Sequence, residues 1–199
     1  MATVMARGNS DMEFAAVEML NLKSDSNVAM IGCGPGIGVV ECARRISSGI
    51  VIGLDPSIVM TERTRKRCCR ARVEQVTKVE RAAAESLPLS DRSQDALVSV
   101  NNIQLWTNRS VGLDECTRVL VPGGVIVVLL HMWAIPSVLP RQEWIKQLRN
   151  DLSARDVHVE KPRIRRFRSG KALVLIGKRS KYFQQNCRTK VIPITHITQ

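Results

Sequence analysis

The sequence predicts a doubly wound α/β domain, with a mostly parallel central sheet, helices on both faces and an antiparallel hairpin at its C-terminal end. Short apolar runs alternate with helical patterns, which is the order expected of βαβ units. Glycines at every second position from Gly32 to Gly38 join the first apolar run to a helical pattern. The run from Val125 to Leu130 is apolar throughout, as in a parallel strand that is buried on both faces.

The length of the chain favours a single domain. It has 199 residues, of which 44% are hydrophobic, and this is enough for one sizeable core. We expect the domain to cover residues 1–180, with a loose start at 1–10 and a disordered basic tail at 181–199.

The first elements form a helix followed by a βαβ unit. Residues 11–22 repeat apolar side chains at the spacing of one helix face. Val28–Ile31 is a short apolar strand, and a helix at about 38–47 follows the glycine turn. The run 50–55 is rich in β-formers and makes a second strand, parallel to the first and next to it.

The later elements follow from the same periodicities and turn signals. Helices are expected at about 56–75, 110–120 and 141–154, and strands at 77–82, 95–100, 125–130, 157–167 and 172–179. A sharp turn at Pro122 to Gly124 leads into the fifth strand. Arg168 to Lys171 signals a hairpin between the last two strands.

The glycine turn predicts a ligand site. Without Cβ atoms, the backbone between strand and helix can lie directly against a ligand, close to free N–H groups at the helix start. The spacing does not give a dinucleotide fingerprint, because neither Gly32 nor Gly34 has a glycine in the sixth place, and no Gly-Lys-Ser/Thr of a P-loop follows. A purely structural βα turn is the alternative, although one or two glycines normally suffice for it.

Asp55 ends the second strand 23 positions after Gly32, close to the interval at which an acidic residue reaches a ribose. Its carboxylate can accept hydrogen bonds from both ribose hydroxyls. Because Pro56 and Ser57 follow, a helix N-cap is the alternative, and the two roles are compatible. The glycine turn upstream favours ribose binding.

The charge of the chain is strongly basic. The formal net charge is +12, and two runs at 63–72 and 161–168 carry much of the excess. This charge can steer the protein toward nucleic acid, an anionic membrane surface or an acidic substrate. Solvated helix and hairpin faces are the alternative, since Phe167 is the one aromatic residue within these runs.

Cysteine and histidine spacing predicts neither disulfides nor a metal site. The six cysteines form no C-x-x-C pair, which is typical of a reduced, cytoplasmic protein. The three histidines do not cluster with cysteines or carboxylates. The N-terminus lacks an apolar signal region, and no apolar run is long enough to span a membrane.

Five motifs in order resemble the small-molecule branch of class I S-adenosylmethionine-dependent methyltransferases, often called type 11. The resemblance covers about residues 13–130 and continues more weakly to 179, and it implies a Rossmann-like sheet. The motifs are Ile31-Gly-Cys-Gly-Pro-Gly36, Gly53-Leu-Asp-Pro-Ser57, Ala84-Glu-Ser-Leu-Pro88, Asp95-Ala-Leu-Val-Ser99 with Asn101-Asn-Ile-Gln-Leu-Trp106, and Leu120-Val-Pro-Gly-Gly124. Each motif alone is weak, but their order and spacing are specific.

The resemblance implies S-adenosylmethionine as cofactor, S-adenosylhomocysteine as product, and a set of contacts. The residues implied to bind the methionine part and ribose are Gly32, Cys33, Gly34, Gly36, Asp55 and Asn101. Those implied to lie near the adenine are Pro56, Met60, Ala84 and Glu85. Gln104, Leu105 and Trp106 are implied to form the floor of the substrate pocket, or alternatively the packed start of a helix.

Acid–base chemistry is weakly represented in the sequence. His131 ends the fifth strand at the edge where this fold binds ligands, and it is the best candidate for a catalytic base. A packing or hydrogen-bonding histidine is the alternative. Glu13 and Trp133 are further candidates for the border of the acceptor pocket.

Two positions depart from the family pattern. Met30 stands where the family usually has an acid two residues before the first glycine, and Ala83 stands where it often has an aspartate. Each missing charge-assisted hydrogen bond costs on the order of 1.5–3 kcal/mol of binding energy. Glu85 is positioned to compensate at the adenine.

Three functions therefore stay open. The favoured one is methyl transfer to oxygen or nitrogen of a small-molecule acceptor by in-line displacement, which demands mainly positioning. The second is methylation of RNA or another polyanion through the basic runs. The third is a non-catalytic binding or scaffold protein. The pocket would be open, or it would be completed by the N-terminal helix or by a second subunit in a homodimer.

Overall fold

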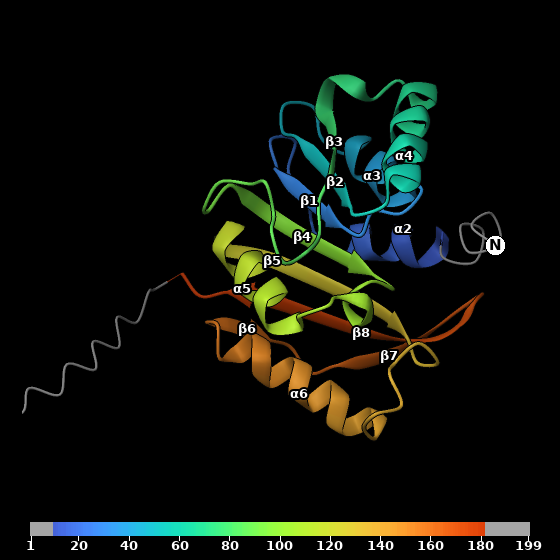
Figure 1. Ribbon diagram of the computed structural model, residues 1–199. Helices are drawn as coiled ribbons and strands as arrows, with labels where there is room; N and C mark the ends of the chain where they lie inside the picture. Colours follow the sequence, from blue (N-terminus) through green and yellow to red (C-terminus); the bar gives the residue numbers. More distant parts are fainter. Residues whose placement is uncertain (1–9, 182–199) are drawn as a thin grey trace, which may run out of the picture.

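A computed structural model describes residues 10–181, and these form a mixed sheet covered by helices on both faces (Figure 1). The sheet has eight strands in the order β3-β2-β1-β4-β5-β8-β6, and β7 pairs with β8 off this path. The strands are β1 Val28–Ile31, β2 Val51–Asp55, β3 Thr77–Arg81, β4 Gln94–Val100, β5 Leu120–His131, β6 Val157–Val159, β7 Arg163–Phe167 and β8 Gly170–Arg179.

Strands β1 to β5 run parallel, and β8 closes the sheet by running antiparallel to β5. β1 lies between β2 and β4, and the chain returns from β3 past β1 to β4, so the strand order reverses at β1. In open α/β sheets, ligands bind outside the carboxyl ends of the strands at this point. The predicted fold class, including the antiparallel C-terminal hairpin, is confirmed.

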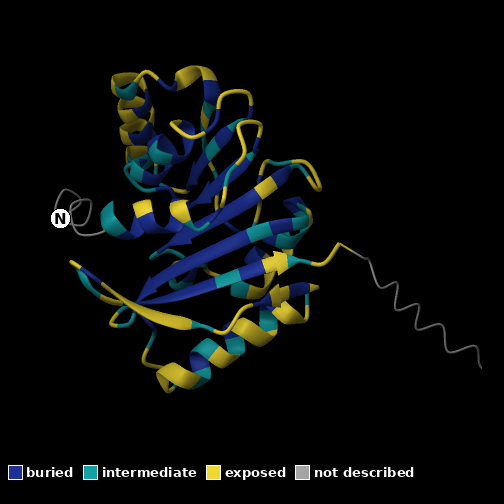
Figure 2. Ribbon diagram, turned by 180° about the vertical axis from the view of Figure 1, so that it is seen from behind, coloured by how far each residue is buried: buried dark blue, intermediate teal, exposed yellow. Residues whose placement is uncertain are grey.

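Two hydrophobic cores fill the space between the sheet and its helices. One core lies under α2 Ser10–Glu18, α3 Ile37–Ala43 and α4 Ile58–Ala71. The other lies under α5 Arg109–Val119 and α6 Arg141–Ser153. Two short 3-10 turns, η1 Glu74–Val76 and η2 Ile103–Leu105, complete the elements. Figure 2 shows that the central strands are buried along most of their length, which the alternation of βαβ units predicts.

Two strand predictions need correction. The run 157–167 is not one strand, because it breaks between β6 and β7, and Pro162 in the gap has no N–H to donate to a ladder. The fifth strand begins at Leu120 rather than after the Pro122–Gly124 turn, and the extra residues produce a shift in its register against β4. The predicted loose start at 1–10 lies outside the described residues except for Ser10, which begins α2, and the predicted tail at 181–199 lies outside them except for Lys181.

Candidate functional site

The glycine turn has a left-handed backbone at three alternate positions. The φ angles are +68° at Gly32, +52° at Gly34 and +79° at Gly36, a region that side chains with a Cβ disfavour. The N–H groups of Gly32 and Cys33 both donate to the carbonyl of Leu54, so the turn is held onto the end of β2. The sequence folds this way because only glycine adopts three such positions in five residues at low cost.

The space around these glycines differs from one to the next. A Cβ on Gly32 would lie 2.0 Å from Asn102 Nδ2, and a Cβ on Gly36 would lie 2.6 Å from Thr64 Cγ2. A Cβ on Gly34 would meet no atom within 4 Å. The middle of the turn is therefore open, and a ligand can lie directly on Gly34, while its two sides are packed by α4 and by the loop after β4.

Asp55 joins the turn to helix α4. Its Oδ2 accepts a hydrogen bond from the N–H of Gly34 at 3.0 Å, and its Oδ1 accepts one from the N–H of Ser57 at 2.9 Å. The helix N-cap is Ser57, whose hydroxyl accepts from the N–H of Met60. Asp55 is therefore not the N-cap of α4. Each oxygen of its carboxylate accepts one backbone hydrogen bond and keeps a lone pair for a ligand hydroxyl.

Glu13 of α2 is a buried carboxyl beside the turn. It is 8% exposed, and its Oε2 has no hydrogen-bond partner among the described residues. Burial raises the pKa of Glu13 to about 8. The thiols of Cys33 and Cys42 are its ionisable neighbours in these interactions, and because a thiol ionises to an anion, neither can supply a positive charge that would favour the carboxylate. On the side of helix α3, a Cβ on Gly38 would lie 2.4 Å from Glu13 Oε2.

The loop after β4 packs a polar cluster onto the turn. The indole N–H of Trp106 donates to Asn102 Oδ1, and the Trp106 ring lies against Gly112 of α5. Gln104 donates from Nε2 to the carbonyl of Asn101 at 3.0 Å, and its buried Oε1 has no partner in the described structure. Trp106 thus belongs to the packed start of α5, which was the alternative for this position, while Gln104 keeps a free acceptor.

His131 forms a chain of hydrogen bonds with Asn101 and Ser169. Asn101 Oδ1 accepts from the backbone N–H of His131 at 2.8 Å, and His131 Nδ1 lies 3.0 Å from the same oxygen. Nδ1 therefore carries the proton, and Nε2 accepts from the Ser169 hydroxyl at 2.7 Å. His131 is 1% exposed, and burial lowers its pKa, an effect opposed by the charge of Asp11. The ring stacks on Trp133 at 5.2 Å.

The remaining predicted residues occupy the same edge with mixed orientations. Ala84 is buried in the core, and Glu85 Oε1 accepts from the N–H of Asn108 at 2.9 Å, at the start of α5. Pro56 is exposed beside Asp55. The Cys33 side chain is 3% exposed and lies against Gly53 in the core, so its backbone alone faces the turn.

A hollow of about 570 Å³ lies in the segment between β5 and α6, and its lining combines apolar side chains with Ser137 and Arg141. It is formed by residues 133–141, including Trp133 and Val138, which are 67% and 82% exposed. Leu105, in the loop after β4, is also 70% exposed. Apolar side chains this exposed favour contact with an apolar ligand or partner.

The sequence predicted that Asn101 contacts the methionine part of the cofactor, but the side chain that lies against Gly32 is that of its neighbour Asn102. Sequence reasoning passed over Ser169, which reaches His131 from the hairpin 38 residues away in the chain. Glu13 was considered for the acceptor pocket, whereas its carboxyl lies beside the glycine turn. The sequence offered one clue to Glu13, which is that this acid stands among the apolar residues of the predicted first helix.

The described residues contain no cluster of three or more histidine, cysteine or acidic side chains arranged to hold a metal ion. No helix among residues 10–181 has the length and apolarity needed to cross a bilayer.

Comparison with known proteins places the chain in a family. A family model described as methyltransferase domain matches residues 29–128, about half of the chain. The chain is 24% identical over 128 residues to the uncharacterised methyltransferase YdaC of Bacillus subtilis, covering 64% of this chain and 68% of YdaC. It is 30% identical over 115 residues to the ubiquinone/menaquinone biosynthesis C-methyltransferase UbiE of Geotalea daltonii, covering 57% of this chain and 49% of UbiE.

Among solved structures, the YcgJ protein of Bacillus subtilis has the same fold, with a TM-score of 0.72 at 15% identity, over 85% of this chain and 99% of that one. The matched region includes the glycine turn, Asp55 and the loop after β4, in the order that the motifs predicted. The resemblance is thus confirmed. The chain belongs to the S-adenosylmethionine-dependent methyltransferases, in the type 11 branch of class I.

Proposed function

We propose that this protein transfers a methyl group from S-adenosylmethionine to an oxygen or nitrogen atom of a small-molecule acceptor. The observation that carries the proposal is the hydrogen bond between Asp55 Oδ2 and the N–H of Gly34, beside the open centre of the turn. It holds a carboxylate with free lone pairs next to a backbone surface that a ligand can approach. A nucleoside with ribose hydroxyls and a flat base suits this combination.

Two unpaired polar atoms support the fit of this cofactor. Oε2 of Glu13 is buried without a partner among residues 10–181, and so is Oε1 of Gln104. Unpaired buried polar atoms are rare in native proteins, and such atoms at a site call for a ligand. S-adenosylmethionine supplies an electrophilic methyl group and also carries an ammonium group. We assign the Glu13 carboxylate to that ammonium, because an adjacent positive charge would offset the cost of ionising Glu13.

The other predicted contacts remain part of the proposal. Asp55 accepts from the ribose hydroxyls, and the backbone at Gly34 lies against the ligand. Pro56 and Met60 border the adenine together with Ala84. Glu85 keeps one carboxylate oxygen beyond its bond to Asn108. Asn101 positions His131 through their hydrogen bond. The next residue, Asn102, packs against Gly32 on the methionine side of the site.

The chain of Ser169, His131 and Asn101 offers a route for the acceptor proton. His131 itself is buried, whereas Ser169 is half-buried and hydrogen-bonded to Nε2. As the acceptor attacks, its proton passes to the Ser169 hydroxyl oxygen while the Ser169 proton passes to His131 Nε2. Asn101 keeps the imidazole in the tautomer that leaves Nε2 free to accept. An O–H or N–H acceptor requires this step, which is why we propose these atoms as the methyl acceptors.

The exposed apolar side chains of Trp133 and Val138 in the hollow between β5 and α6 support a small acceptor with an apolar body. UbiE, which the chain resembles over part of its length, is named for quinone biosynthesis, and an aromatic acceptor would suit the exposed Trp133 ring in this protein. This class of acceptor is proposed from the lining of the hollow together with that likeness.

The test begins with calorimetric titration of S-adenosylmethionine and S-adenosylhomocysteine, followed by a screen of phenols, quinols and amines with methyl-labelled cofactor. We expect saturable cofactor binding that Asp55→Ala weakens, and transfer of label to an apolar phenol or amine. Absence of cofactor binding at millimolar concentration would favour the non-catalytic alternative instead.

A further inference from the structure

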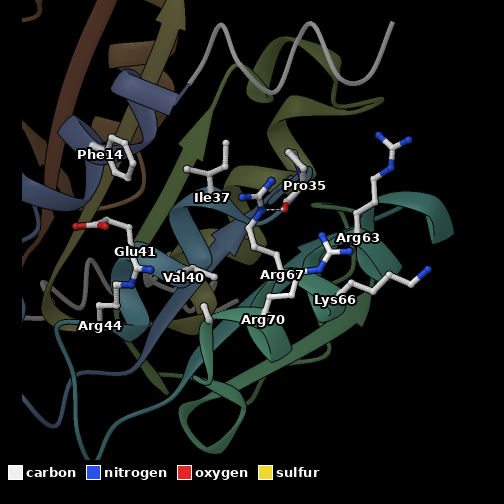
Figure 3. Close-up of a pocket in the computed structure, with 11 residues that line it drawn as sticks. Phe14, Pro35, Ile37, Val40, Glu41, Arg44, Arg63, Lys66, Arg67 and Arg70 are labelled. Atoms are coloured by element: carbon white, nitrogen blue, oxygen red, sulfur yellow. Dashed lines mark hydrogen bonds between the residues drawn. The ribbon is translucent and has the colours of Figure 1, made fainter.

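A second hollow, of about 580 Å³, lies on the outer side of the helices that cover the first core, and five of its eleven lining residues are basic (Figure 3). Phe14 of α2, Pro35 of the glycine turn, and residues of α3 and α4 form it, and none of its lining comes from the ends of β2, β3 or β4. It adjoins the glycine turn through Pro35, but it contains none of the residues proposed to contact the cofactor. Its cationic side chains are Arg44, Arg63, Lys66, Arg67 and Arg70.

The spacing along α4 creates this charge. Residues 63, 66, 67 and 70 are related by steps of three and four, so their side chains share one face of the helix. The buried residues Thr61, Thr64 and Cys68 occupy the other face. Like charges at these spacings destabilise a helix by roughly 0.2–0.5 kcal/mol per pair. The helix thus carries a concentration of positive charge that opposes its own stability.

The charges in this hollow are mostly uncompensated. Arg67 donates from Nε to the carbonyl of Pro35 at 2.7 Å, which ties α4 to the glycine turn. Glu41, the acidic residue in the lining, is paired with Arg45 at 2.9 Å. The side chains of Arg44, Arg63, Lys66 and Arg70 make no hydrogen bond or ion pair within residues 10–181. Four cations around one hollow are consequently available to an anion.

We propose that this hollow is a docking site for single-stranded nucleic acid. Arg63, Lys66 and Arg70 would contact successive phosphates, which supply the missing negative charge. Phe14 lies in the same lining and is 43% exposed, so its ring offers a surface on which a base can stack. A basic groove combined with an aromatic ring is the pattern of single-strand binding, whereas phosphate binding alone does not need the ring.

This docking site is a function separate from methyl transfer, and the proposal does not depend on whether a methyl acceptor is found. It also specifies which basic surface is involved, because α4 contributes to the hollow and β7 does not. The arginines of β7 are exposed on a strand and provide an internal comparison of equal charge.

The first experiment measures binding of the full chain to a fluorescent oligouridylate of about 12 nucleotides by anisotropy, from about 50 to about 200 mM salt. The pair Lys66→Gln and Arg70→Gln is compared with the control pair Arg165→Gln and Arg166→Gln. We expect the α4 pair to weaken binding about tenfold or more, and to reduce the salt slope by about 1.4, or about 0.7 for each lost phosphate contact. We expect the β7 pair to change affinity less than about twofold.

Thermal melts of both pairs keep the result interpretable. The α4 pair should unfold at the same or a higher temperature than the parent at low salt, because it relieves like-charge repulsion. No binding by the native protein at low salt would overturn the proposal. An equal loss in both pairs would also overturn it, since binding would then follow overall charge rather than this hollow.

The second experiment tests the base-stacking part with Phe14→Leu, which keeps an apolar side chain on α2. We expect weaker binding to the oligonucleotide, by about 5-fold or more, and unchanged binding to inorganic polyphosphate. Equal affinity of the variant and the parent for the oligonucleotide would show that the occupant is a simple polyanion. Stronger binding to polyglutamate than to the oligonucleotide would show that it is an acidic protein.

Discussion

Glu13 and Met30 meet at Gly38: the Oε2 of Glu13 and the Cε of Met30 would each lie 2.4 Å from a Cβ at that glycine. The two side chains come from different elements, α2 and β1. Met30 occupies the position where the type 11 pattern usually has an acid. Helix α2 thus brings a carboxyl group close to the end of the side chain that replaced that acid.

This relationship predicts that Glu13→Gln changes both stability and cofactor binding. Because the pKa of Glu13 is raised from 4.5 to about 8, the native state keeps a proton that the unfolded state has lost. Stability of the parent should therefore fall as the pH rises from about 4.5 to about 8, and Glu13→Gln should remove this fall. Thermal melts across that range measure it, with the exposed Glu18→Gln of the same helix as control.

The same variant tests the proposed contact with the cofactor ammonium. Binding of S-adenosylhomocysteine to the parent near pH 7 should release a proton as Glu13 ionises, which calorimetry in buffers of different ionisation enthalpy detects. Glu13→Gln should abolish the release and weaken binding by about 10-fold or more. Unchanged proton release in the variant would assign the ammonium to another group.

Asp55→Ala should remove the ribose contact. Loss of hydrogen bonds to a charged acceptor costs about 1.5–3 kcal/mol, so we expect the Kd for S-adenosylhomocysteine to rise by about 10- to 100-fold. The control is Asp95→Ala: Asp95 accepts one backbone N–H, from Asn27 at 2.8 Å, whereas Asp55 accepts two, and Asp95 lies near the start of its strand rather than at the end. Calorimetric titration measures both, and equal affinities for the two variants would count against ribose binding at Asp55.

Gly34→Ala and Gly36→Ala should show which glycine leaves room for the ligand and which is needed for packing against α4. Both alanines would adopt a left-handed backbone, which costs about 1–2 kcal/mol. Gly36→Ala should lose further stability, because its Cβ would lie 2.6 Å from Thr64 Cγ2. The Cβ of Gly34→Ala would enter open space, so its main effect should be weaker cofactor binding. Denaturant unfolding and titration with S-adenosylhomocysteine, performed on both variants, provide the comparison.

Ser169→Ala should shift the titration of His131. Burial lowers the pKa of His131 below 6.5, so its neutral form stabilises the fold and this contribution is lost as the pH falls below about 6.5. Removing the Ser169 hydroxyl takes away a donor to the neutral ring and should raise the pKa. Nitrogen-15 NMR of the imidazole measures this value and the tautomer. Ser137→Ala, an exposed serine, should leave both unchanged, and a parent tautomer with the proton on Nε2 would contradict the proposed relay.

Arg118→Ala should loosen the loop that carries Glu85. The Arg118 guanidinium is bonded to Glu115 and Asp91 and donates to the carbonyls of Leu87 and Leu89. We expect a loss of about 1–3 kcal/mol in the free energy of unfolding. Arg118→Lys should not restore it, because an ammonium cannot reproduce the planar fork. Denaturant unfolding measures the loss, and an effect no larger than that of the exposed Arg149→Ala would show that the network adds little.

The fold was predictable because its signals are local. Val28–Ile31 was predicted with its observed bounds, since an apolar run ending in glycine has few alternatives as a strand. Errors arose where pairing decides the boundary. β6 and β7 join the same edge of β8 but pair with different parts of it, 177–179 and 170–174, and residues 160–162 between them belong to neither strand.

The candidate site was predictable only in part. The glycine turn and Asp55 lie at the ends of neighbouring strands, and the order of motifs along the chain was enough to bring them together. Asn101 and Asn102 show the limit, because adjacent residues after a strand point in different directions. Asn101 turns to His131, and Asn102 turns to Gly32.

The sequence by itself determined the class of fold, the family, the glycine turn with its carboxylate and the basic character of α4. Each of these depends on residue type and on spacing within one segment or between consecutive segments. Tertiary structure alone decided that Oε2 of Glu13 lies beside Gly38 without a partner in the described part of the chain, that Ser169 completes the chain of hydrogen bonds through His131, and that the α4 cations line a hollow together with Phe14. Such contacts join residues distant in the chain, and their distances are set by how helices pack on the sheet, which no local pattern encodes.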